Sequence, residues 1–102
     1  GYEKASQFDF ELQVDDTSFN MGSHVVFQQG AQVRVKAPSS GAVLVRLYRN
    51  GQQIVEVSAQ DMVYDLSKPG VYHAEAYQVR PRLFGSEEAR LWIISNPIWV
   101  EE

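Results

Sequence analysis

Hydrophobic residues recur at every second position along most of this chain. The stretch from Phe8 to Val14 alternates apolar and polar side chains, and the same spacing returns over residues 33–37, 43–48 and 71–77. A period of two places successive side chains on opposite faces of a β-strand. We find no segment with the 3.6-residue period and the capping residues of a helix. The pattern therefore predicts an all-β domain.

Turn residues separate these stretches at short intervals. Asp15-Asp16 starts one turn, and Asn50-Gly51 is the strongest signal for a two-residue hairpin because both residues accept a positive φ. Pro97 interrupts the last predicted strand, Leu91–Val100, and should lie at an edge or a bulge because proline cannot donate a ladder hydrogen bond. The spacing predicts about seven or eight short strands, packed as two antiparallel sheets.

The strand that follows Pro69-Gly70 indicates which kind of sandwich this is. Its period places Tyr72, Ala74 and Ala76 on one face and His73 and Tyr77 on the other. A tyrosine that opens a late strand after such a turn is typical of the tyrosine corner in immunoglobulin-like domains. We therefore predict an immunoglobulin-like or fibronectin-III-like antiparallel β-sandwich.

Ala74 stands where an immunoglobulin domain carries a disulfide cysteine, and this chain has no cysteine. The core must then be held by packing alone. We expect the space beside Ala74 to be filled from the facing sheet by Val33, Val35, Val45 and Leu47.

The length of 102 residues fits one domain. We assign residues 1–7 to an N-terminal tail, with Gly1 as a cloning remnant, and residues 8–102 to a single β-sandwich domain cut from a longer protein. The sequence carries no targeting segment, so its compartment, cytoplasmic or extracytoplasmic, stays open.

The net charge of −4 is modest and spread along the chain. The nearest approach to a basic cluster is Arg80-Pro81-Arg82, which we read as a solvated loop. This distribution argues against a nucleic-acid partner. No apolar run has the roughly 18 residues of a membrane span, so we expect no membrane insertion.

The usual signatures of catalysis are missing from the sequence. His24 and His73 are distant and lack metal-ligand spacing, and no nucleophile-elbow or phosphate-loop motif occurs. The acidic pairs Asp15-Asp16 and Glu87-Glu88 lack the further oxygen ligands of a calcium site. We expect no catalytic residue, no metal site and no cofactor.

Aromatic residues are the one candidate for recognition. Tyr48, Tyr77 and Trp92 fall on predicted strands, where outward-facing rings would stack on sugars or dock on another domain. Simple strand packing explains aromatic residues at such positions equally well, because strands and interfaces are both enriched in them.

Four motifs occur in order over most of the chain: Met21-Gly22, Arg49-Asn50-Gly51, the strand Gly70–Tyr77 and the closing run Leu91–Val100. In identity and order they resemble the C-terminal domain of bacterial PHP-family metal-dependent phosphoesterase-like proteins. The family's usual arginine after the tyrosine is His73 here.

This resemblance implies a bacterial parent protein whose N-terminal catalytic domain binds metals and hydrolyses phosphoesters. None of that domain's motifs lies in this chain, so no catalytic or metal residue is carried over. We expect a non-catalytic accessory domain that packs on the catalytic domain of the same polypeptide. In this reading, Asn96 bonds nearby backbone and Pro97 bends the last strand. The alternative is a module that binds carbohydrate or protein through Tyr48, Tyr77 or Trp92.

Overall fold

The computed structural model describes residues 8–38, 41–81 and 85–102, and within these ranges the chain forms strands and no helix. Ten strands occur: β1 (Asp9–Val14), β2 (Thr17–Asn20), β3 (His24–Val26), β4 (Gln32–Lys36), β5 (Val43–Arg49), β6 (Gln52–Val57), β7 (Asp61–Asp65), β8 (Gly70–Pro81), β9 (Glu87–Ile94) and β10 (Ile98–Glu101). The all-β prediction is confirmed. The tail assigned to residues 1–7 lies outside the described residues.

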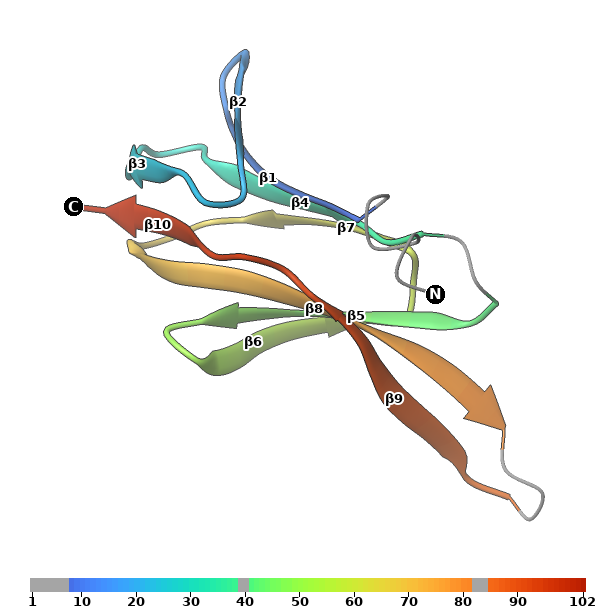
Figure 1. Ribbon diagram of the computed structural model, residues 1–102. Coiled ribbons are helices and arrows are strands. Elements are labelled where there is room, and N and C mark those ends of the chain that lie inside the picture. Colours follow the sequence, from blue (N-terminus) through green and yellow to red (C-terminus); the bar gives the residue numbers. More distant parts are fainter. Residues whose placement is uncertain (1–7, 39–40, 82–84) are drawn as a thin grey trace.

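Two sheets face each other in layers (Figure 1). The smaller sheet has the order β2-β1-β4-β7, and the larger has the order β3-β10-β8-β5-β6, with β9 also paired to β8. The described pairs are antiparallel except for β3 and β10, which run parallel. β8 and β9 continue together past the other strands. We call the end of β8 from Gln78, together with β9 up to Arg90, the arm.

The core lies between the sheets and contains the apolar face of each strand. Phe10 and Leu12 on β1 are buried with Val33 and Val35 on β4, opposite Leu47 on β5 and Tyr72, Ala74 and Ala76 on β8. Every residue that we expected beside Ala74 is buried. However, Val45 and Leu47 belong to the same sheet as Ala74, because β5 pairs directly with β8, so only Val33 and Val35 come from the facing sheet.

The predicted Asn50-Gly51 turn takes the expected geometry. Asn50 and Gly51 both have positive φ and connect β5 to β6, as the hairpin signal predicted. The Asn50 Oδ1 atom accepts a hydrogen bond of 2.9 Å from the Val71 N–H, which joins this turn to the start of β8. The Tyr72 hydroxyl donates a 2.6 Å hydrogen bond to the Lys68 carbonyl, four residues upstream.

Two sequence-based expectations for strands were wrong, and a third was right in part. Thr17–Asn20 forms β2, which the polar residues of that segment did not signal. Pro97 interrupts the last predicted strand as expected, but the interruption is a full break between β9 and β10, where the Pro97 carbonyl accepts a hydrogen bond from the Gly22 N–H. Arg80 and Pro81 end β8 and pair with β9, so they are not a loop; Arg82 lies outside the described residues.

Candidate interaction face

The outward side of the larger sheet gathers polar and aromatic side chains at its centre. The period of β8 buries Tyr72, Ala74 and Ala76, so His73, Glu75 and Tyr77 point away from the core. On β5, Tyr48 lies directly opposite His73, and Arg46 lies opposite Glu75. We call these five residues, Arg46, Tyr48, His73, Glu75 and Tyr77, the outer network.

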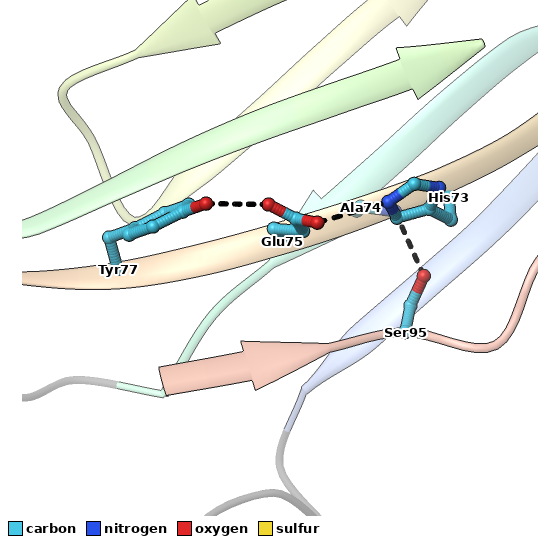
Figure 2. Close-up of polar contacts among 5 residues, drawn as sticks. All are labelled: His73, Ala74, Glu75, Tyr77 and Ser95. Atoms are coloured by element: carbon cyan, nitrogen blue, oxygen red, sulfur yellow. Dashed lines mark hydrogen bonds and ion pairs between the residues drawn. The ribbon is translucent and has the colours of Figure 1, made fainter. Parts of the chain in front are cut away.

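Glu75 accepts hydrogen bonds from both sides along β8. The Tyr77 hydroxyl donates to Glu75 Oε1 at 2.6 Å, and His73 Nε2 lies 3.2 Å from Glu75 Oε2. Figure 2 shows the three side chains in a row on the same face of the strand. Both carboxylate oxygens are therefore engaged by neighbours on the same strand.

The rings of the outer network are already covered on one face. Tyr48 and His73 stack with centroids 4.6 Å apart and planes 4° from parallel. The Arg46 guanidinium carbon sits 4.4 Å from the centre of the Tyr77 ring, and Arg46 Nε donates to Glu56 Oε1 at 2.7 Å. Such stacking and cation–π contacts fix the side chains before any partner arrives.

Three groups of the network, Glu75, Tyr77 and Arg46, have a fixed charge at neutral pH. Burial alone would raise the pKa of Glu75, but hydrogen bonds from Tyr77, His73 and Tyr48 outweigh it and hold that pKa below its usual value. Burial and the Glu75 carboxylate raise the pKa of Tyr77, and the hydrogen bond to Glu56 raises the pKa of Arg46. Glu75 is thus ionised, Tyr77 protonated and Arg46 charged.

A second stack of the same kind lies near the edge of the larger sheet. The rings of His24 on β3 and Trp99 on β10 are 4.6 Å apart and 3° from parallel. His24 Nδ1 is also 2.9 Å from Glu101 Oε1. Both histidines of the chain therefore lie on this face, each against one aromatic ring and one glutamate.

Exposed apolar side chains surround these two groups. Leu91 and Ile94 on β9 lie opposite the outward residues Tyr77 and Glu75. Val26 follows the same outward alternation, beside the inward-facing Val25, and Ile54 is exposed at the bulge of β6. Among the residues that the structure describes, the larger sheet holds four of the five exposed large apolar side chains, and the fifth is Val63.

The outward face of the smaller sheet is different in character. It presents charged residues of both signs around the exposed Val63: Asp9, Glu11, Arg34, Lys36, Asp61 and Asp65. This mixture is typical of a surface in contact with water. The contrast makes the outward face of the larger sheet the candidate interaction face.

The candidate face also contains a groove beside the arm. Its volume is about 620 Å³, and Leu44, Arg46, Glu56, Val79 and Ala89 are among its lining residues. Since Arg46 belongs to the outer network, the groove and the network form one continuous surface.

The predicted aromatic residues divide into two environments. Tyr48 and Tyr77 lie on the candidate face and are linked through His73, Glu75 and Arg46. Trp92 falls at the bulge between β8 and β9, and its ring packs against the core. The structure therefore does not bring Trp92 together with the two tyrosines.

Ser95 is a structural residue that the sequence analysis missed. Its Oγ accepts a 2.9 Å hydrogen bond from the buried Ala74 N–H, and its own N–H donates to the Ala74 carbonyl at 2.9 Å (Figure 2). Asn96 is exposed, and its side chain makes no hydrogen bond within the described part of the chain. A serine next to a ladder-breaking Asn-Pro pair is the signal that would have identified this contact.

Within the described residues, no group of three or more histidine, cysteine, aspartate or glutamate side chains is arranged to hold a metal ion. The described ranges also contain no helix with the length and apolar character to cross a membrane.

Comparisons with protein-family models, with curated proteins and with solved structures find no match to this chain.

Proposed function

We propose that this chain is a non-catalytic accessory domain that docks on a neighbouring protein domain through the outward face of its larger sheet. The contrast between the two outward faces carries the proposal. The smaller sheet has charged residues around one exposed apolar side chain, Val63, whereas the larger sheet has two ring stacks and four exposed apolar side chains. Interface centres are enriched in aromatic residues and arginine and depleted of lysine. The described lysines, Lys36 and Lys68, lie elsewhere.

The outer network suits a face that becomes buried. The side chain of Glu75 is only 14% exposed already, and both of its oxygens are hydrogen-bonded. Covering a satisfied and partly buried group costs less than desolvating a free carboxylate. The apolar residues around it, such as Leu91 and Ile94, would supply the gain from burial.

We further propose an immunoglobulin-like fold for the domain. The hydrogen bond from Tyr72 to the Lys68 carbonyl supports it, because a corner tyrosine bonds back to the chain a few residues upstream. The parallel pairing of β3 with β10 in an otherwise antiparallel sandwich is a second trait that fits this assignment.

The sequence motifs support a particular neighbour, the N-terminal catalytic domain of a PHP-type metal-dependent phosphoesterase in the same polypeptide. In this proposal the catalytic domain performs hydrolysis, and the present domain positions it or shapes access to its site. Gly70 illustrates how one motif acts structurally, since a Cβ there would lie 2.7 Å from Nε of Arg49 in the Arg-Asn-Gly motif.

The test compares the full-length parent, a version without this domain, and two single substitutions in the full-length protein. Ile94→Glu places a charge on the candidate face, and Val63→Glu does so at an equally exposed position on the other sheet (58% and 56%). We expect Ile94→Glu to reproduce the loss of phosphoesterase activity on domain deletion, and Val63→Glu to behave as the parent. Folded variants with equal activities would refute docking through this face.

Ligand binding through the same face is the second candidate, favoured by the adjacency of Tyr48 and Tyr77. A sugar that stacks on aromatic rings needs open ring faces, and one face of each tyrosine is covered by His73 or Arg46. A glycan panel read by tryptophan fluorescence tests this candidate, and a saturable change with any glycan would favour it over docking.

A further inference from the structure

The sheets of this domain end in strand edges whose backbone groups are open to another strand. Proteins protect such edges by keeping them short, by charging them or by bulging them. β2 and β3 have four and three residues. β6 carries a bulge at Ile54. Pairing of β7 with a second β7 about Val63 would place Asp61 opposite Asp65 twice, and like charges in that position are destabilising.

The edge of β9 also carries charges and a bulge, but its charges are of both signs and its bulge lies after the regular part of the strand. Within the described residues β9 pairs with β8 alone, and the pairing is regular from Glu87 to Leu91, before the bulge at Trp92. This segment belongs to the arm, which projects beyond the other strands (Figure 1), so a second chain can reach its free edge.

The charges along this edge complement themselves. Glu88 and Arg90 are two residues apart and face the same side of β9, and Arg90 Nε donates to Glu88 Oε2 at 2.7 Å. In an antiparallel pair of identical strands centred on Ala89, Glu88 of each chain lies opposite Arg90 of the other. The two neighbouring registers that keep the faces aligned would instead place Glu88 opposite Glu88, or Arg90 opposite Arg90.

We propose that two copies of this chain pair through the free edges of β9, antiparallel, with Ala89 at the two-fold axis. The interface is isologous, as a two-fold dimer requires. Backbone hydrogen bonds between the two β9 strands supply most of the affinity, as in other cases of strand addition, and the Glu88–Arg90 pairs select the register. The proposal is independent of docking through the sheet face.

Analytical ultracentrifugation of the full chain tests the pairing up to about 1 mM, the weak end of specific association. We expect the mass to rise with concentration from 11.6 kDa towards twice that value. Glu88→Arg and Arg90→Glu each place like charges opposite each other in the dimer, so each variant alone should stay monomeric. The double exchange Glu88→Arg with Arg90→Glu should dimerise again.

Mixing the two single variants gives the sharpest readout. A chain with two arginines then faces a chain with two glutamates, and we expect a heterodimer from two monomeric variants. A role of these residues in stabilising only the arm of one chain does not produce this result. Asp16→Arg, which makes the same charge change on the β1–β2 turn, should dimerise as the wild type does.

Three outcomes overturn the proposal: a wild-type chain that stays monomeric throughout, single variants that dimerise as the wild type does, or a mixture that stays monomeric. Circular dichroism of each variant confirms the fold. If the single variants do not fold, the double exchange, which keeps both charge types, remains the deciding sample, and its failure to dimerise while folded also overturns the proposal.

Discussion

Ser95 occupies the position where the partner of β8 changes from β10 to β9. Tyr72 is the last β8 residue paired with β10, and Glu75 is the first paired with β9. The Ala74 N–H between them would have no strand partner, and the Ser95 hydroxyl accepts its hydrogen bond. One hydroxyl thus keeps the ladder continuous across the break that Pro97 imposes.

We expect Ser95→Ala to lower the free energy of unfolding by about 1–3 kcal/mol, because it leaves a buried N–H without an acceptor. Urea denaturation measures the change, with Asn96→Ala as the neighbouring control. The sequence alone suggested a loss for Asn96→Ala, whereas the structure places the contact on Ser95. A loss for Asn96→Ala that equals or exceeds that for Ser95→Ala would contradict this assignment.

Glu75 makes stability depend on pH. Its pKa is lower in the folded chain than its ordinary value of 4.5, so its contribution is fully present above that value. The contribution is lost as the pH falls below 4.5 and through the folded-state pKa. We expect Glu75→Gln to reduce stability at neutral pH and to flatten the acid limb of the stability curve. Denaturation midpoints across the acid range measure both, and an unchanged acid limb would show that Glu75 is not the group responsible.

The residues of the candidate face could be predicted only in part. The alternation in β8 correctly placed His73 and Tyr77 away from Tyr72, because a period of two depends on local sequence alone. Tyr48 and Arg46 lie next to His73 and Tyr77 because of the register between β5 and β8, and no local sequence pattern contains that register. Trp92 was grouped with the tyrosines because the bulge that directs it to the core is not visible in the sequence.

At the scale of elements, strands with a clean apolar alternation were predicted well and polar or divided ones were not. β4 and β5 follow their alternating valines and leucine closely. β2 contains a single apolar residue, Phe19, and forms because β1 offers it a partner across the Asp15 turn. The division of β9 from β10 depends on β8 being long enough to pair with both.

The Asn50-Gly51 turn connects more than its own hairpin, since Asn50 also bonds Val71 at the start of β8. We expect Asn50→Ala to cost about 1–2 kcal/mol, because alanine disfavours a positive φ and cannot accept that hydrogen bond. Gln52→Ala, at an exposed position just after the turn, is the control. Thermal denaturation measures both, and equal melting temperatures would show that the turn does not need Asn50.

For the molecule as a whole, stability should decrease from the sandwich towards the arm. Ala74 and Ala76 lie on a strand with partners on both sides and are fully buried, whereas Arg80 and Ala89 in the arm pair only with each other's strand. Amides that open with few buried contacts exchange fastest. We expect exchange at Arg80 and Ala89 to be at least about tenfold faster than at Ala74, measured by NMR at dilute concentration. Uniform protection would show that the arm is as stable as the core.

The two outward faces of the sandwich differ in chemical character. One sheet presents mixed charges to water, and the other presents the outer network and the exposed apolar residues. The core between them is continuous, so the domain folds through one set of contacts and leaves the second face available. This arrangement separates the buried core residues from most of those proposed for docking.

Because β8 changes its partner from β10 to β9, the length of the arm can vary without a change in the rest of the fold. Beyond the hydrogen bond from the Val79 N–H to the Ala42 carbonyl, the arm is held by the pairing of β8 with β9, and the sandwich resumes at Leu91. Residues added or removed in matched numbers, two on β8 with two on β9, would keep every side chain of the arm on its present face. For protein engineering, the arm is thus a site where a recognition sequence can be grafted and its reach adjusted without redesign of the core.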